Sequence, residues 1–249
     1  MYPVLFSIGP LTIHSYGLML GIAFLVTTYL ASKRAKIFNI PKDTVSNLTI
    51  LFLISGVIGA RIAYVLANMS YFVGDPLQIL MINKGGLIFY GGLILAFISG
   101  IICAKITNLD ILDVADLMAP FITLGHAIGR LGCFLNGCCF GRSTDSCLGI
   151  RFPHTLAKVY PTQLFSFAGL LILFFLLIFL QNRRSFKGEI ISSYLILYGM
   201  FRFLIEFLRG DLLVVFYGLT STQLLSIILV VVGIILFVFT KHLKKYPSA

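Results

Sequence analysis

The feature that most restricts the fold of this chain is a set of long runs without a charged residue. The purest runs are residues 85–104 (GGLIFYGGLILAFISGIICA), 161–182 (PTQLFSFAGLLILFFLLIFLQN) and 212–240. A helix that crosses the hydrocarbon core of a bilayer needs about 20 mostly apolar residues, and each of these runs is that long. They therefore predict membrane-spanning helices, the last of which begins near Thr220 after a short loop.

Four further runs are long enough to span a bilayer but contain more polar or charged residues. They are residues 15–32, 45–67 with Arg61 inside, 113–132 with Arg130 near the end, and 190–208 with Arg202 and Glu206 inside. Charged residues make up only 11% of the 249 residues, against roughly 25% in soluble domains. The chain is therefore predicted to be an all-α membrane protein, a single domain (residues 1–249) built as a bundle of seven transmembrane helices.

The distribution of lysine and arginine predicts the orientation, because cytoplasmic loops carry an excess of both. With the N-terminus outside, eleven fall on the inner side: Lys33, Arg34, Lys36, Lys42, Lys105, Arg183, Arg184, Lys187, Lys241, Lys244 and Lys245. Six fall on the outer side: Lys84, Arg130, Arg142, Arg151, Lys158 and Arg209. We therefore expect the N-terminus outside and the C-terminus in the cytoplasm. This insertion rule and the attraction of anionic lipid headgroups explain most of the net charge of +10, so no nucleic-acid partner is expected.

Two connections on the expected outer side are long, residues 68–84 and 133–160. Reactive residues are concentrated on loops that a rigid scaffold positions, so we expect a functional head of loops on the outer face. The N-terminal segment lacks the basic region of a signal peptide, and we expect it to be retained.

Ionisable side chains within a span cost a few kcal/mol each and usually face a cavity or one another. On an ideal helix, Tyr198, Arg202, Glu206 and Arg209 fall within an arc of about 80°, which predicts one polar stripe. Arg202 and Glu206 also have a purely structural interpretation, in which they neutralise each other.

The arginines nevertheless exceed the acidic partners in the predicted spans. The four arginines Arg61, Arg130, Arg202 and Arg209, set against Glu206, leave a net excess of three positive charges. An anionic ligand resolves this imbalance. Arginine makes bidentate contacts with phosphate, and a phospholipid headgroup is the phosphate most available at this depth.

The segment 125–147 (GHAIGRLGCFLNGCCFGRSTDSC) holds four of the five cysteines: Cys133, Cys138, Cys139 and Cys147. A zinc site with His126 or His154 is weakly indicated, because C-x4-C-C-x7-C has no second ligand pair. A disulfide from Cys147 to Cys138 or Cys139 suits an oxidising compartment better, and small buried hydrophobes are the default interpretation. We expect neither a metal ion nor a cofactor.

Glycines recur through the same segment at three- to five-residue spacing: Gly125, Gly129, Gly132, Gly137 and Gly141. Such glycines allow close packing of helices, or the approach of backbone N–H groups to a ligand where the helix breaks. With Arg130 and Asn136 as polar groups, a ligand site is favoured over packing alone.

Residues 129–142 (GRLGCFLNGCCFGR) resemble the signature segment of the phosphatidylglycerol-prolipoprotein diacylglyceryl transferases, bacterial membrane enzymes that begin lipoprotein maturation. Further blocks agree in order: IHSYGLML (13–20), GARIAYV (59–65), GGLIFYGGL (85–93), YPTQLF (160–165) and YGMFRFLIEFLRGD (198–211). The resemblance covers most of the chain. It implies seven spans, an outer N-terminus and a multi-pass location in the bacterial inner membrane.

The resemblance also implies roles for individual residues. Arg130 matches the arginine that contacts phosphatidylglycerol, and Arg202 matches a second essential arginine. Other functional positions are matched by Tyr16, Asn136, Gly141, Tyr198 and Glu206, while Arg61 and Arg209 are expected to be secondary phosphate-binding or structural groups. This chain differs by having Cys133, Cys138 and Tyr90 where well-known members have Asn, Glu and His, the last proposed as a catalytic base.

The implied function is a transferase of lipoprotein biosynthesis (protein lipidation). It moves the diacylglyceryl group of phosphatidylglycerol to the lipobox cysteine of preprolipoproteins and releases glycerol 1-phosphate. Arg130, Arg202 and Tyr90 are the expected catalytic residues, and the expected partners are phosphatidylglycerol, preprolipoprotein signal peptides and membrane lipids. Two alternatives stay open: a thiol-disulfide oxidoreductase using the cysteines of 133–147, and an anion or lipid transporter.

Overall fold

The computed structural model describes residues 2–8, 11–72, 74–81, 85–153, 155–210, 214–216 and 218–245. Lys84 and His154, named above for charge and metal ligation, lie outside these residues. The chain divides into two compact units. One consists of Met1–Ala31 with Ala115–Ala249, and the other of Ser32–Val114.

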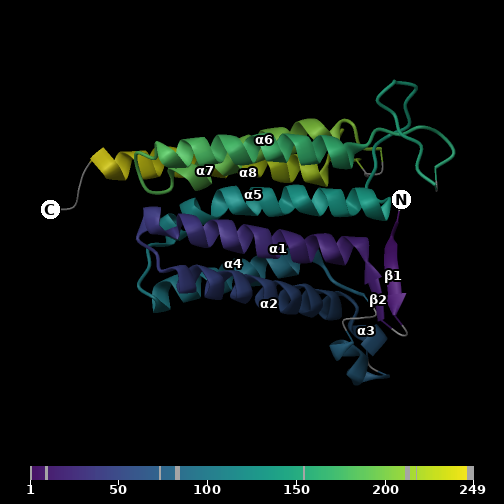
Figure 1. The fold of residues 1–249 in the computed structure, drawn as a ribbon, viewed down its shortest axis with the longest axis horizontal. Helices are drawn as coiled ribbons and strands as arrows, with labels where there is room; N and C mark the ends of the chain where they lie inside the picture. The colour runs from purple at the N-terminus through teal and green to yellow at the C-terminus, as the bar shows by residue number, and fades with distance from the viewer. Residues whose placement is uncertain are drawn as a thin grey trace. The chain divides into compact units, whose positions relative to one another are not determined.

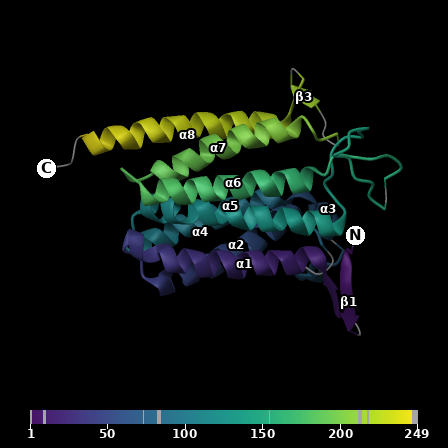
Figure 2. The same cartoon turned by 45° about the horizontal axis from the view of Figure 1, so that its top comes forward.

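The larger unit holds most of the long helices. Its elements are β1 (Val4–Ile8), β2 (Leu11–His14), α1 (Ser15–Arg34), α5 (Ile111–Asn136), α6 (Thr162–Asn182), α7 (Glu189–Glu206), β3 (Val214–Phe216), β4 (Leu219–Thr220) and α8 (Ser221–Lys245), of which α1 and α5 each extend into the smaller unit. Helices α6, α7 and α8 lie side by side (Figures 1 and 2). The strands pair as two antiparallel hairpins, β1 with β2 and β3 with β4.

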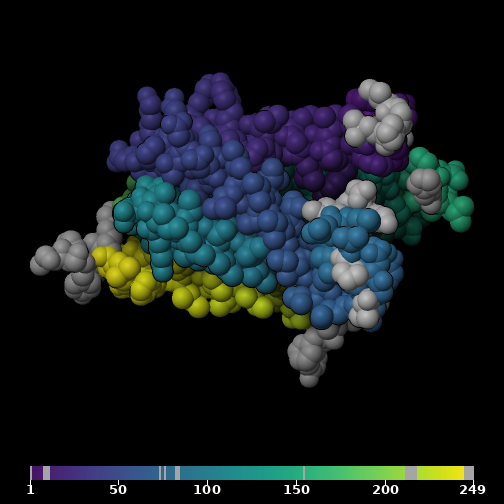
Figure 3. Space-filling model, turned by 90° about the horizontal axis from the view of Figure 1, so that it is seen from below, coloured from purple at the N-terminus to yellow at the C-terminus, as the bar shows by residue number. Residues whose placement is uncertain are grey.

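The smaller unit is built on two long helices. Its elements are η1 (Ala35–Phe38), α2 (Lys42–Ala67), α3 (Met69–Phe72), η2 (Pro76–Leu80) and α4 (Phe89–Ile106). Small residues bring α2 and α4 together, since a Cβ on Gly59 would lie 2.5 Å from the carbonyl oxygen of Gly91. The hydroxyls of Ser55 and Ser99 join the two helices at 2.9 Å. Figure 3 shows the two helices in contact along this face. Such packing through small residues is typical of membrane helices.

Each of the seven predicted runs coincides with a helix among the described residues, and the helix ends differ from the predicted ends by a few residues. Six are long and apolar enough to cross a membrane: Ser15–Phe38, Lys42–Ala67, Phe89–Ile106, Ile111–Asn136, Thr162–Asn182 and Ser221–Leu243. Helix α7 does not meet that criterion, because its 18 residues include Glu189, Arg202 and Glu206. The chain is thus an all-helical, multi-pass membrane protein apart from two short hairpins that the sequence did not predict.

The N-terminus of α7 is held by one buried carboxylate. Asp116 of α5 accepts backbone hydrogen bonds from Gly188, Ile190 and Ile191 at 2.7, 3.0 and 2.9 Å and forms an ion pair with Arg184 at 2.7 Å. Free N–H groups and the helix dipole both favour a negative charge there. Asp116 therefore fixes where α7 begins relative to α5.

The opposite ends of the same helices are also tied together. Tyr2 donates a backbone hydrogen bond to Leu135 near the end of α5, at 3.1 Å. Beyond α5, the backbone N–H of Arg142 donates to the carbonyl of Leu208 after α7, at 2.9 Å. The N-terminal hairpin, the end of α5, the start of α6 and the end of α7 thus lie at the same end of this unit (Figure 2).

Candidate functional site

An ion pair lies in the last turn of α7. Arg202 Nη1 and Glu206 Oε2 are 2.6 Å apart, and the carboxylate side chain is only 1% exposed. The other carboxylate oxygen, Oε1, accepts a hydrogen bond from Thr220 Oγ1 at 2.9 Å. Thr220 also accepts from the backbone of Gln223, whose side chain in turn accepts from the backbone of Thr220. This reciprocal capping box begins α8 and fixes the carboxylate that orients Arg202.

Arg130 lies in the last two turns of α5, in the same unit as Arg202. Its Nε donates to His126 Nε2 at 3.2 Å, and the His126 ring packs against Tyr198 of α7, with centroids 5.6 Å apart. No other hydrogen-bond partner of the Arg130 guanidinium lies among the described residues, so both terminal nitrogens are available there. Arg130 and Arg202 interact electrostatically with each other and with His126, so the two arginines lie near one another.

Tyr16 and Arg209 lie around these arginines. Tyr16, in the first turn of α1, interacts electrostatically with Arg130 and with the thiols of Cys133, Cys138 and Cys139. Arg209 interacts in the same way with Arg202 and Cys139.

The prediction that Arg209 lies on the same helix as Arg202 and Glu206 is wrong. Helix α7 ends at Glu206, so Arg209 lies three residues beyond it. The tertiary structure nevertheless leaves Arg209 close to the arginine pair.

The cysteine segment begins inside α5, not in the predicted loop. Cys133 is in the last turn of the helix, and Gly137 follows it with φ 74°. The backbone N–H groups of Gly137 and Cys138 donate to the carbonyls of Phe134 and Cys133, both at 3.1 Å. This pair of hydrogen bonds is a Schellman motif. It brings the residue after the glycine back over the third residue before the helix cap, and so explains why C-x4-C places Cys133 beside Cys138.

All five cysteines are free thiols, so the disulfide considered from the sequence is not formed. Cys147 is exposed in the loop. Hydrogen bonding from the Cys133 thiol lowers the pKa of the Cys139 thiol to about 5, and the charges of Arg209 and Arg130 act in the same direction. Burial raises the pKa of the Cys138 thiol. The cluster thus favours a thiolate on Cys139.

Asn136 and Gly141, two further predicted site residues, make different contacts. The Asn136 side chain hydrogen-bonds the Cys138 thiol. Gly141 is buried, and its backbone N–H donates to the carbonyl of Tyr160 at 2.8 Å. A Cβ on Gly141 would collide with the carbonyl oxygen of Leu208 and lie 2.7 Å from the methyl group of Thr162. This close approach favours a packing role for Gly141 over direct contact with a ligand.

Arg61 lies in the smaller unit, and all its nitrogens hydrogen-bond backbone carbonyls. Nε donates to Ile79 at 2.8 Å, and Nη1 donates to Gly85 and Gly86 at 2.7 and 3.0 Å. Nη2 donates to Gln78 at 2.5 Å and Met81 at 3.4 Å. A guanidinium has five N–H donors, so this set leaves none for a phosphate. The geometry favours the structural role of Arg61 over the substrate-binding role.

Tyr90 is also in the smaller unit, in the first turn of α4. Its side chain is exposed, and its ring packs edge-on against Phe89 with centroids 5.8 Å apart. No hydrogen bond of its hydroxyl occurs within the described chain. The structure therefore does not itself indicate a catalytic contact for Tyr90.

The contact of His126 with Arg130 and that of Thr220 with Glu206 were not predicted from the sequence. The T-x-x-Q pattern of residues 220–223 was a readable signal, because it marks a capping box. The histidine lies four residues before Arg130, a spacing that makes two side chains neighbours on a helix. Only the tertiary structure shows that Thr220 reaches Glu206.

Known proteins match this chain over almost its whole length. The sequence profile of the prolipoprotein diacylglyceryl transferase family matches residues 3–239. A phosphatidylglycerol-prolipoprotein diacylglyceryl transferase of Clostridium tetani is 32% identical over 98% of this chain and 100% of its own length. Similar enzymes of Clostridium perfringens (35%; 96% and 95% covered) and Finegoldia magna (37%; 94% and 93% covered) also match. This chain therefore belongs to the prolipoprotein diacylglyceryl transferase family.

Proposed function

We propose that this membrane transferase moves the diacylglyceryl group of phosphatidylglycerol to the cysteine thiol of a prolipoprotein. Membership of the family supports this reaction over the oxidoreductase and transporter alternatives. The observation that carries the proposal is the pair of guanidinium groups, Arg130 and Arg202, that interact at one end of the larger unit. Arginine binds phosphate in a bidentate manner, which suits a phospholipid headgroup.

The reaction alkylates sulfur at a saturated carbon. The substrate thiol loses its proton to solvent, its sulfur bonds to the glyceryl carbon of the lipid, and the bond from that carbon to the phosphate oxygen breaks. Glycerol 1-phosphate leaves with the electron pair of that bond. Negative charge therefore grows on the leaving phosphate, and preorganised cationic donors stabilise such charge most effectively.

We assign the phosphodiester to Arg130 and Arg202. Arg209 adds positive charge, and Glu206 orients Arg202 through their ion pair. Tyr16, Asn136 and Tyr198 are proposed to bind the glycerol headgroup or the thiol. The positive field of the arginines favours the thiolate form of the substrate, which reduces the need for a strong base. Tyr90 is proposed to assist the transfer only through its hydroxyl. Arg61 is not assigned to phosphate binding, because backbone carbonyls occupy its N–H donors.

We further propose that α7 is the seventh span and that the N-terminus lies outside a bacterial cytoplasmic membrane. The length of α7, about 27 Å at 1.5 Å per residue, is close to the thickness of the hydrocarbon core. Its ion pair lowers the cost of burying Arg202 and Glu206. The excess of lysine and arginine in the inner loops supports the orientation. Family membership over residues 3–239 supports one catalytic domain that includes both units.

The test is a transfer assay with the purified chain, vesicles containing phosphatidylglycerol, and a lipobox peptide. Thioether formation is expected with the wild type. Arg130→Gln and Arg202→Gln are each expected to lower the rate at least about 100-fold, or ~2.7 kcal/mol. Near-wild-type turnover by either folded variant would overturn the phosphate assignment, and a wild type that forms no thioether would overturn the reaction. Tyr90→Phe is expected to cost about tenfold, and an unchanged rate reduces Tyr90 to packing.

A further inference from the structure

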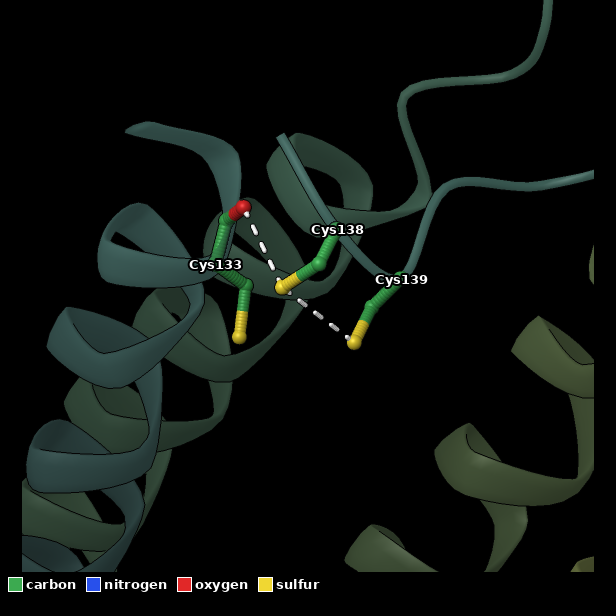
Figure 4. A group of neighbouring side chains, drawn as sticks. All are labelled: Cys133, Cys138 and Cys139. Atoms are coloured by element: carbon green, nitrogen blue, oxygen red, sulfur yellow. Dashed lines mark hydrogen bonds between the residues drawn. The ribbon is translucent and has the colours of Figure 1, made fainter. Parts of the chain in front are cut away.

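The proposed transfer does not account for the three cysteines at the end of α5. The Sγ atoms of Cys133, Cys138 and Cys139 all lie within 4.8 Å of one another. Figure 4 shows the three thiols converging from the last turn of α5 and from the loop that follows it. We propose that these thiols form a binding site for one soft metal ion with a filled d shell, such as Zn²⁺, Cd²⁺ or Cu⁺. The site does not depend on the proposed transfer reaction.

The spacing of the sulfur atoms fits ligation by a single ion. Zinc–sulfur bonds are about 2.3 Å long, so two thiolates on one ion lie about 3.8 Å apart in tetrahedral geometry and ~4.0 Å apart in trigonal geometry. The Sγ atoms of Cys138 and Cys139 are already 3.7 Å apart. Small side-chain rotations would therefore bring the group to ligation distance.

The backbone holds the three thiols in this arrangement without an ion. The Schellman motif around Gly137 returns Cys138 over Cys133, as described above. Cys139 has φ 62°, a left-handed conformation that is uncommon for a residue other than glycine. Such a conformation persists only where its surroundings impose it, and it is often found at ligand sites.

Helix α6 supplies part of those surroundings. Thr162 Oγ1 donates to the carbonyl of Cys139 at 2.9 Å, and Gln163 Nε2 donates to the carbonyl of Cys138 at 2.6 Å. Both side chains are buried at the start of α6. The two cysteines are therefore anchored through their backbones, which leaves their side chains to face Cys133.

The charge of the surroundings suits a metal–thiolate complex. Three thiolates with a divalent ion carry a net charge of −1, and with a monovalent ion −2. Arg130 and Arg209 both interact electrostatically with Cys139. These guanidinium groups compensate a charge that would be costly in a half-buried site.

The sulfur-only set also selects the class of ion. Soft thiolate ligands prefer Zn²⁺ and Cu⁺ over the hard cations that oxygen ligands bind. Within the described chain, the convergent group contains no histidine or carboxylate. A tetrahedral ion would thus keep one open position, unlike the closed four-ligand sites of structural zinc, and we expect the ion to exchange with solution.

The experiment uses the purified full-length chain in detergent, reduced and stripped with a chelator, and titrated with Cd²⁺. Cadmium–thiolate bonds give a charge-transfer band in the ultraviolet. We expect the band to saturate at one ion per chain. Cys138→Ser and Cys139→Ser are each expected to weaken binding at least about tenfold, because losing a direct ligand costs no less than losing an outer-shell partner. The matched controls Cys103→Ser and Cys147→Ser, outside the cluster, should keep both band and stoichiometry.

The proposal is overturned if the wild type shows no band, if the Cys138→Ser/Cys139→Ser double variant keeps it, or if Cys147→Ser removes it. Thermal unfolding of each metal-free variant checks that it folds, and Cys133→Ala serves if a serine variant does not. Arg202→Gln, which is expected to slow transfer at least about 100-fold, should keep the band. Failure of the metal site and failure of the transferase assignment therefore give different results.

Discussion

The carboxylate of Glu206 holds the guanidinium of Arg202 at 2.6 Å, one turn away on α7. Because Glu206 is buried and also accepts from Thr220 at the start of α8, the position of Arg202 depends on a second helix. An arginine held in this way keeps its orientation when a ligand arrives, which is the preorganisation that electrostatic catalysis requires.

The first prediction concerns this ion pair. Glu206→Gln keeps the shape of the side chain but removes its charge, so Arg202 loses its orienting partner. We expect kcat/KM for thioether formation to fall at least about tenfold, or ~1.4 kcal/mol. The control Thr220→Ser keeps the hydroxyl that donates to the same carboxylate and caps α8, and should cost less than Glu206→Gln. Equal losses in the two variants would contradict the primary role of the charge.

The second prediction separates charge from geometry at Arg130. Arg130→Lys keeps the positive charge but loses the planar pair of terminal nitrogens that a phosphate binds in a bidentate manner. We expect a loss of about tenfold or more in kcat/KM, measured with phosphatidylglycerol as the varied substrate. Arg151→Lys, at an exposed arginine of the following loop, is the control and should be unchanged. Full activity of Arg130→Lys would mean that a point charge is sufficient.

The third prediction concerns Arg61. Arg61→Met leaves up to five backbone carbonyls in the 78–86 segment without their donor, so we expect a loss of stability of about 3 kcal/mol or more. Thermal unfolding in detergent measures this loss. Lys105→Met, at an exposed lysine of the same unit, should have little effect. A stable Arg61→Met with a raised KM for phosphatidylglycerol would restore the substrate-binding role.

The fourth prediction concerns the buried carboxylate at the start of α7. Asp116→Asn breaks the ion pair with Arg184 and replaces one acceptor oxygen by a donor that faces backbone N–H groups. Removing one partner of a buried pair typically costs about 3–5 kcal/mol. We expect a loss of stability of that size, measured as a lower unfolding temperature. Asp145→Asn, at an exposed position, is the control. An unchanged unfolding temperature would show that Asp116 does not hold α7.

The fifth prediction tests Gly141 as a packing residue. Gly141→Ala places a methyl group against the carbonyl oxygen of Leu208, so the loop and the end of α7 must separate. We expect both a lower unfolding temperature and a lower transfer rate. Gly17→Ala has open space around it and should leave the unfolding temperature unchanged or higher. A stable Gly141→Ala variant with only a raised KM would favour direct contact with the ligand.

Much of the fold could be predicted because a bilayer imposes a length rule. A run of about 20 apolar residues satisfies its backbone hydrogen bonds only as a helix in hydrocarbon, so the six helices that are apolar enough to cross a membrane could be predicted from charge-free or nearly charge-free runs. The two hairpins were missed, because they are short and pair only a few residues next to the spans. Helix α5 continues four residues beyond its predicted end, because Cys133 and Asn136 are helical where the sequence predicts a loop.

The amino-acid sequence is enough to place arginines within apolar helices, since a charge in such a run is visible without knowing its neighbours. Which of these arginines keeps donors for a ligand depends on contacts made in the folded chain. Arg61 and Arg130 are alike in sequence terms, but backbone carbonyls occupy the first, while the second has one histidine contact among the described residues. Hydrogen bonds between segments far apart in the chain make this difference, and no local pattern encodes them.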